Sequence, residues 1–240
     1  MSKILRNIYD LSGKPPQVCL CMIVKNENHV IRRCLESVKP MITSWCIVDT
    51  GSVDGTQDII REVLADLPGE LHERPWVDFA ANRTECLALS DSLNPDYLLT
   101  IDADEVASGE LKPDPWPLLG AVMVSVNGQP PLPRCVFMKA KRPWVYKGRI
   151  HEYPTMNGYI IPHVLIRGLR FDTVNDGSRH FTSGWDKDDL ELMMLELQEN
   201  PDQRNAYLLA RMLESRGRKD EAAVFWGLCP DYQIELNRSA

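Results

Sequence analysis

Three carboxylates fall within four positions of the chain, at Asp102, Asp104 and Glu105, directly after 97–101, a run of residues that favour burial. Two aspartates two residues apart can hold Mg²⁺ or Mn²⁺ while substrate oxygens complete the coordination shell. Unpaired carboxylates are costly to bury, so this crowding needs a cation or a solvated cleft. The pattern predicts a buried strand that ends in a charged site, and a solvated acidic turn is the alternative.

A second candidate site is the stretch 49–56, which joins a carboxylate to glycines. Asp49 is able to accept a hydrogen bond from a base or a ribose, and the glycines let the backbone approach a ligand closely. Asp54 with Gln57 also predicts a capping box for the following helix. Farther along, Arg83 at a helix start is placed to reach a phosphate or the donor base, although such a side chain is usually a surface charge.

Aromatic and titratable residues gather at 144–152, which suits a sugar pocket lined by Trp144. There His151 is a candidate to complete a metal shell, and Glu152 is a candidate general base. For a lone histidine, a hydrogen-bonded structural role is the default.

The segment Arg134–Arg149 contains six basic side chains and no acid, in a chain of net charge −7. Such a stretch can neutralise a donor diphosphate, or it can grip an acceptor nucleic acid by phosphate contact and stacking. A solvated positive face is the third possibility.

Composition bounds the class of protein. The chain has 240 residues, and its 44% hydrophobic and 25% charged content is that of an ordinary globular protein with one core and a small appendage. Met1–Lys14 is polar and mixed, and no apolar run approaches membrane-spanning length, so we expect a cytoplasmic protein with no membrane partner. The seven cysteines are scattered through apolar runs without a C-x-x-C pair, which favours small buried side chains.

The elements that must position these residues alternate along the first half of the chain. Apolar runs at 18–24 and 45–48 also stop at polar residues, and residues at helical spacing follow each of them. This alternation predicts βαβ units and a mainly parallel sheet, with three strand ends forming the site at one edge.

The second half changes character. Short strands are predicted at 121–126, 135–140, 148–153 and 159–166, which would extend the sheet in antiparallel fashion. From Ser183 the apolar spacing is helical, as in a little more than one helical-repeat unit. We therefore expect a domain over 1–182, with a nucleotide-sugar half at about 15–105 and an acceptor half at about 106–182, and a helical appendage over 183–240.

Several motifs in order carry a family likeness. The chain resembles family 2 glycosyltransferases of the GT-A fold in Cys-Met-Ile-Val-Lys-Asn-Glu at 21–27, Asp-Thr-Gly-Ser-x-Asp-Gly-Thr at 49–56 and Ile-Asp-Ala-Asp-Glu at 101–105. The segment 78–83, His151-Glu152 and the terminal helices resemble the branch with tetratricopeptide-like repeats. The likeness covers roughly residues 18–228.

The resemblance implies an inverting transfer from a nucleotide-diphosphate sugar, often a UDP-sugar, with Mn²⁺ or Mg²⁺. On that pattern Asp104 ligates the ion, Asp102 lies near the ribose and the ion, and His151 completes the shell. The residues assigned to the donor are Val24, Asn26, Glu27, Asp49, Gly51, Ser52, Asp54, Arg83, Asp102, Ala103 and Trp144.

The base and the acceptor are the open points. Glu152 is the first candidate base and Asp176 the second. The histidine expected three residues before Asp176 is Thr173, so His180 is an alternative metal ligand. The acceptor is a protein side chain, a glycan precursor or a hydroxymethylated DNA base reached through the basic stretch.

Two other classes remain as alternatives. A sugar nucleotidyltransferase would carry a glycine-rich basic loop after its first strand, where Lys25–Asn28 has no glycine. A non-catalytic binding module would use the helical tail and would have no need for clustered carboxylates.

Overall fold

The protein is described by a computed structural model over residues 16–111, 117–126, 131–157, 161, 163–174, 176–178 and 185–230. The chain divides into two compact units. The first comprises Met1–Lys147 and Tyr153–Phe181, and the second comprises Gly148–Glu152 and Thr182–Ala240. The predicted boundary near residue 182 stays a prediction, and no local pattern in the sequence indicates that Gly148–Glu152 groups with the helices.

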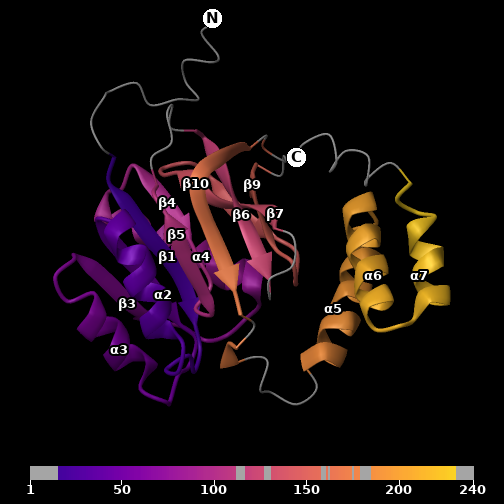
Figure 1. Ribbon diagram of the computed structural model, residues 1–240, viewed down its shortest axis with the longest axis horizontal. Helices are drawn as coiled ribbons and strands as arrows, with labels where there is room; N and C mark the ends of the chain where they lie inside the picture. Colours follow the sequence, from indigo (N-terminus) through magenta and orange to yellow (C-terminus); the bar gives the residue numbers. More distant parts are fainter. Residues whose placement is uncertain are drawn as a thin grey trace, which may run out of the picture. The chain divides into compact units, whose positions relative to one another are not determined.

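An eight-stranded sheet forms the first unit, within the described residues. Its order is β3 (Gly69–Glu73), β2 (Ser44–Asp49), β1 (Val18–Val24), β4 (Tyr97–Thr100), β7 (Leu132–Lys139), β6 (Leu119–Val126), β10 (Val164–Thr173) and β5 (Glu105–Gly109). The strands from β3 to β4 are parallel, whereas β7 is antiparallel to both of its neighbours. The predicted α/β class, a parallel sheet with an antiparallel extension and helices at the C-terminal end, is confirmed (Figure 1).

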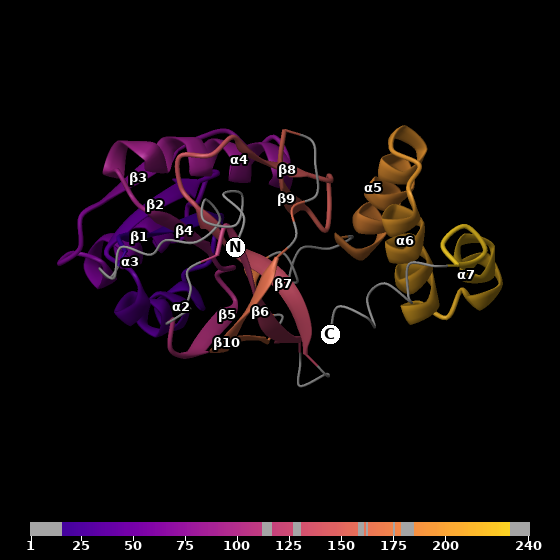
Figure 2. The same ribbon diagram turned by 90° about the horizontal axis from the view of Figure 1, so that it is seen from above.

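Helices cover both faces of the parallel half. Figure 2 shows α4 (Phe79–Leu89) on one face, with α2 (Ile31–Val38) and α3 (Thr56–Val63) on the opposite face. On α2 the buried residues recur at the helical spacing that the sequence predicted. The N-cap of α4 is Asp78, whose side chain accepts the Ala81 N–H at 2.7 Å.

Alternation along β1 separates two cores. Leu20 and Met22 belong to the core beneath α2 and α3, whereas Cys19 and Cys21 belong to the core beneath α4. Cys86 of α4 packs into that second core, together with Cys46 of β2. All seven cysteines are free, and six of them are buried, as expected for small core side chains.

Three local predictions were wrong. The segment 148–153 is not a strand, because β8 (Trp144–Lys147) and β9 (Tyr153–Met156) pair on either side of the loop Gly148–Glu152. The strand β5 was missed. Gly55, with φ 90°, is the N-cap of α3, so Asp54 and Gln57 form no capping box.

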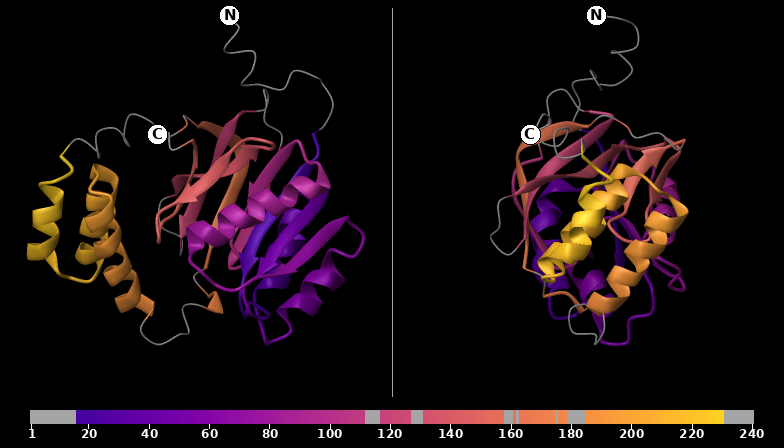
Figure 3. Two further views of the ribbon diagram at one scale, coloured as in Figure 1. Left: turned by 180° about the vertical axis from the view of Figure 1, so that it is seen from behind. Right: turned by 90° about the vertical axis from the view of Figure 1, so that its right-hand side faces the viewer.

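The helices of the second unit are α5 (Trp185–Glu199), α6 (Gln203–Ser215) and α7 (Lys219–Trp226) (Figure 3). Its core includes Met193, Leu209 and Leu213 from the helices and Ile150 from the loop Gly148–Glu152. Among the described residues, none of the helices has the length and apolar character needed to cross a bilayer.

Candidate functional site

The loops that follow β1 and β2 are hydrogen-bonded to each other. Their bonds are Asn26 N–H to Ser52 Oγ (2.8 Å), Val53 N–H to Asn26 Oδ1 (2.9 Å), Glu27 N–H to Thr56 Oγ1 (2.8 Å), Asn28 N–H to Asp54 Oδ2 (3.0 Å) and Asn28 Nδ2–H to the Asp54 carbonyl (2.8 Å). Asn26, Ser52 and Asp54, which were predicted to bind the donor, therefore build the loops. The Val24 carbonyl likewise accepts from Thr50.

Asp49 lies at the carboxyl end of β2 and is fully buried. Its Oδ1 accepts the N–H groups of Gly51 and Ser52, each at 2.7 Å. Gly51 has φ 110°, a conformation that favours glycine. The second carboxylate oxygen of Asp49, Oδ2, is buried and has no hydrogen-bond partner among the described residues. A buried carboxylate oxygen without a donor is costly, so a ligand N–H or O–H would complete it.

Asp102 opens the acidic turn after β4 and is held by two guanidinium groups. Arg83 of α4 pairs with its Oδ1, and Arg134 of β7 donates to its Oδ2 at 3.2 Å. Burial alone would raise the pKa of Asp102, but the two positive charges outweigh it and lower the pKa to about 2. Asp102 is therefore ionised at any physiological pH.

Glu105 ends the same turn and is completely buried. Its carboxylate accepts the Asp102 N–H at 3.0 Å and the Thr173 hydroxyl at 2.7 Å, and it pairs with Arg134. The sequence identified the carboxylate but not its partners. A buried carboxylate requires a cation nearby, but nothing in the sequence indicates that Arg134 supplies it.

Asp104 lies between these two and differs from both in its surroundings. Within the described residues its carboxylate forms no ion pair, and Gly177 packs against it so closely that an added Cβ would lie 3.3 Å from the Asp104 Cβ. Burial and then repulsion from Asp102 and Glu105 raise the pKa of Asp104 to about 6. Ala103, predicted to contact the donor, is buried in the core below.

Glu27 follows β1 and faces the same region. Its carboxylate accepts the Ser178 N–H at 3.0 Å. Burial is the main reason that the pKa of Glu27 is raised to about 7; the Ser178 bond opposes this rise, and the charge of Asp104 adds to it. The turn and the first loop thus bring together two carboxyl groups that resist ionisation, a common property of ligand sites.

Asp176, the second candidate base, is bound by Arg33 through two hydrogen bonds of 3.1 and 2.8 Å. These bonds are the main reason that its pKa is lowered. The Asp176 carbonyl also contacts His29 Nε2 at 2.7 Å. A carboxylate stabilised in this way is a weak proton acceptor.

His151 and Glu152 lie in the loop Gly148–Glu152 of the second unit. The His151 carbonyl accepts from Arg204 at 2.6 Å. Their roles as metal ligand and base stay predictions, and His180 lies outside the described residues.

Trp144 is buried, and its indole N–H donates to the Lys139 carbonyl at 2.7 Å. It packs in the core beneath α4. The predicted contact of Trp144 with the donor sugar stays a prediction, and the packing of Trp144 in this core does not support it.

The basic stretch is largely paired inside the protein. Four of its six side chains have protein partners: Arg134 with Asp102 and Glu105, Lys139 over the Tyr97 ring (4.4 Å to the centroid), Lys141 with Asn94, and Arg149 with Glu199 (2.7 Å). Arg142 and Lys147 are exposed. The charge asymmetry that favoured a nucleic acid thus has an internal explanation.

A divalent ion was expected at the acidic turn. Among the residues that the structure describes, no three Asp, Glu, His or Cys side chains are grouped so as to hold one. Asp102 and Glu105 are paired with arginines, so Asp104 is the one carboxylate of the acidic turn without an ion pair among the described residues. These residues alone therefore do not make a metal site.

Comparisons with known proteins agree with the motifs. Residues 19–119 match the family model described as glycosyl transferase family 2, which confirms the predicted resemblance over that segment. A TPR repeat-containing protein of Synechococcus elongatus is 42% identical over 95 residues, 40% of this chain and 22% of that protein. The SPbeta prophage-derived glycosyltransferase SunS of Bacillus subtilis is 33% identical over 105 residues, 43% of this chain and 24% of that protein. The chain spans about a quarter of the length of these relatives.

Solved structures give weaker likenesses. Staphylococcus aureus TarS aligns with a TM-score of 0.44 at 12% identity, over 82% of this chain and 43% of that chain. Residues 1–349 of TarS in complex with UDP align with a TM-score of 0.43 at 9% identity, over 91% of this chain and 92% of that one. Overlaps at this level support no argument about function.

Proposed function

Because residues 19–119 match the family model described as glycosyl transferase family 2, we propose that this chain is a glycosyltransferase. It would move a sugar from a nucleotide-diphosphate sugar, with a UDP-sugar as the first candidate, to an acceptor nucleophile. Attack on the face opposite the leaving diphosphate would invert the anomeric carbon.

The observation that carries the proposal is the buried, unpartnered Oδ2 of Asp49. It lies at the end of β2, where ligands bind in open α/β sheets. The uracil ring offers an imide N–H, and the ribose offers hydroxyl groups, each able to donate to this oxygen. The other oxygen is already saturated by two backbone N–H groups, so the carboxylate is oriented before the ligand arrives.

Arg83 supplies charge that the chemistry needs. As the glycosidic bond breaks, the sugar carbon becomes electron-deficient and the diphosphate gains negative charge. The Arg83 guanidinium at Asp102 is suited to bind phosphate oxygens, since its N–H groups match that geometry. We assign Arg83 to leaving-group stabilisation.

The acceptor proton goes to a carboxylate. Asp176 is the weaker candidate because Arg33 stabilises its charged form. Glu152 remains the first candidate base.

Metal dependence is part of the proposal. A divalent ion would add positive charge at the leaving diphosphate, with Asp104 as one protein ligand and His151 or His180 as a further one. The acceptor stays open among a protein side chain, a glycan precursor and a hydroxymethylated DNA base.

The test is binding of UDP, ADP, GDP, CDP and UDP-sugars, measured by calorimetry and thermal shift with Mn²⁺ and then with EDTA. Stabilisation by UDP and one UDP-sugar, and by no other nucleotide, supports the proposal. Loss of that stabilisation in EDTA supports the metal. If no nucleotide-sugar binds under either condition, the proposal is wrong.

A further inference from the structure

Arg134 connects two carboxylates of the acidic turn, although it comes from β7 in the second half of the first unit. One of its nitrogens donates to Asp102 Oδ2 at 3.2 Å, and the other pairs with Glu105 Oε2. Its side chain is 38% exposed, so it lies at the edge of the site and not inside the core.

Glu105 is the fixed end of this connection. Its side chain is fully buried, and its two oxygens also accept the Thr173 hydroxyl and the Asp102 N–H. The Glu105 N–H in turn donates to the Asp102 carbonyl at 3.1 Å. A buried carboxylate with this many donors has one available position, so the guanidinium that pairs with it is held in place.

Asp102 is the more exposed end of this connection. It lies on the turn after β4, and its side chain is 38% exposed. Arg83 contacts one of its oxygens and Arg134 the other. Because a planar guanidinium donates from two nitrogens in a fixed fork, Arg134 can set the orientation of Asp102 relative to Glu105, which a lysine ammonium cannot do.

We propose that Arg134 is a positioning residue for the donor: anchored on buried Glu105, it holds the Asp102 carboxylate in the orientation in which it accepts hydrogen bonds from the ribose hydroxyls of a nucleotide-sugar. This inference rests on the proposed function. It differs from a purely structural role, in which Arg134 only neutralises the buried charge of Glu105.

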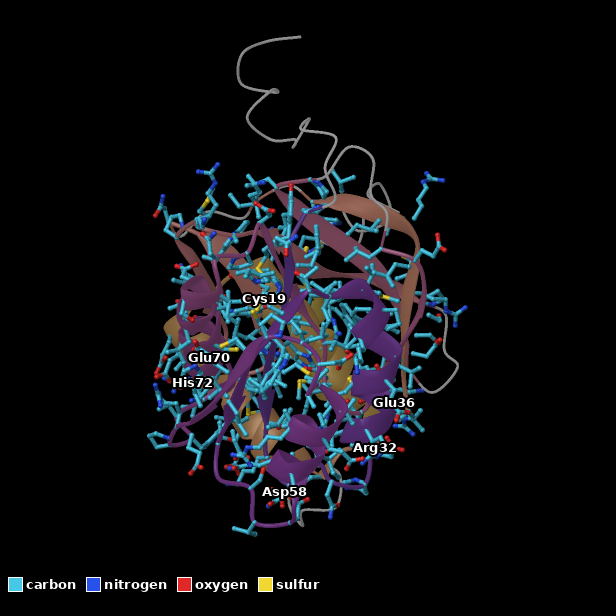
Figure 4. The ribbon with its side chains drawn as sticks, turned by 90° about the vertical axis from the view of Figure 1, so that its left-hand side faces the viewer. Cys19, Arg32, Glu36, Asp58, Glu70 and His72 are labelled. Carbon is cyan, nitrogen blue, oxygen red and sulfur yellow. The ribbon has the colours of Figure 1, made fainter. Side chains whose placement is uncertain are left out.

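Four variants separate the two roles. Arg134→Met leaves Glu105 buried without its cation, so it should lower the melting temperature. Arg134→Met with Glu105→Gln removes both charges while Gln keeps an acceptor oxygen, so it should recover the wild-type melting temperature. Arg134→Lys keeps the charge without the fork. Arg32→Met is the control, because the side chain of Arg32 on α2, labelled in Figure 4, is exposed and pairs at 2.7 Å with exposed Glu62 on α3.

For the wild type and each variant we would measure the melting temperature and the dissociation constants for UDP and for the UDP-sugar that the wild type binds. We would also measure kcat and KM for turnover of that UDP-sugar. We expect the double variant to melt like the wild type but to bind the donor at least tenfold more weakly, with KM raised more than kcat is lowered. Arg134→Lys should lie between the wild type and Arg134→Met in donor affinity, and Arg32→Met should match the wild type.

Two failures are distinguishable. If the wild type binds a UDP-sugar and the double variant binds it equally well, Arg134 only neutralises Glu105 and the inference is overturned while the proposed function stands. If the wild type binds no nucleotide-sugar, the proposed function is wrong and the inference falls with it.

Discussion

Charge is distributed unevenly among the carboxylates of the site. Asp102 and Glu105 are matched by Arg83 and Arg134, whereas the described residues offer the side chain of Asp104 no cation. Glu27 shares this condition, and both groups have pKa values raised toward neutrality. In the free protein these two carboxylates oppose folding when they ionise, which is expected of groups kept for a ligand.

Glu27→Gln is therefore expected to stabilise the free protein at high pH. The folded-state pKa of about 7 exceeds the ordinary value of 4.5, so the contribution of Glu27 to stability is complete below pH 4.5 and is lost as the pH rises through 7. The variant should melt like the wild type at pH 4.5, and its free energy of unfolding should exceed that of the wild type by up to about 3 kcal/mol at pH 8. Thermal melts from pH 4.5 to 8 measure this, with Glu62→Gln as an exposed control. A gain of the same size at both pH values would contradict the prediction.

Asp49→Asn tests the unpartnered oxygen. Asparagine keeps one acceptor for the Gly51 and Ser52 N–H groups but places an NH₂ group at the second position, which cannot accept from a ligand. The dissociation constant for UDP should rise about 10- to 100-fold, as for loss of a charged hydrogen bond. Calorimetry measures this, with Asp58→Asn on the exposed side of α3 as the control. Unchanged affinity would mean that the ligand does not use this oxygen.

Single residues were predictable where the signal was local. A carboxylate at the end of an apolar run marks a strand end, and in this way the sequence located Asp49 and Asp102. The partners of Glu105 were not predictable, since Arg134 and Thr173 follow it by 29 and 68 residues. Trp144 shows a different limit. The local sequence of an aromatic residue beside titratable residues does not distinguish a position in the core from one that lines a pocket.

At the scale of elements, the parallel half of the sheet was predictable because the apolar residues of each strand and each helix follow the spacing typical of that element. The antiparallel extension was not, because its pairing is decided by distant segments. The strand β5 is the clearest example: it pairs with β10, whose residues follow it by about sixty positions, and its own sequence, Glu-Val-Ala-Ser-Gly, is weakly apolar.

Gly109 at the end of β5 gives a prediction for this pairing. It has φ 92°, and an added Cβ would lie 1.8 Å from the Gly168 carbonyl oxygen. Gly109→Ala should cost about 2–4 kcal/mol in unfolding free energy, since strain and a backbone clash add. Gly168→Ala is the matched control, with φ 86° and open space, and should cost about 1–2 kcal/mol. Urea denaturation measures both, and equal losses would show that the close approach is relieved by movement of β10.

At the scale of the whole molecule, the two units are interleaved in sequence. The loop Gly148–Glu152 leaves the first unit between β8 and β9 and contributes Ile150 to the core of the helices. Arg149 of the same loop pairs with Glu199 of α5 at 2.7 Å, within the second unit. The helical unit therefore depends on residues that precede it by more than thirty positions, which its own periodicity could not reveal.

Ile150→Ala is expected to loosen the helical unit and leave the parallel sheet unaffected. Loss of the buried side chain should cost about 2–3 kcal/mol locally. Hydrogen exchange of the full chain should be faster in α5, α6 and α7 and unchanged in β1, β2 and β4. Val224→Ala, at a position 64% exposed, is the control and should change neither. Faster exchange in both units would show that they unfold together.

The thiol layer beneath α4 has a practical consequence. Cys19, Cys21, Cys46 and Cys86 are 0–2% exposed, so an alkylating reagent can reach them only when α4 separates from the sheet. Cys86 lies one helical turn beyond Arg83 on α4. The alkylation rate of these four cysteines thus measures how often α4 separates from the sheet. A ligand that binds Arg83 would lower this rate, and no cysteine has to be introduced to detect its binding.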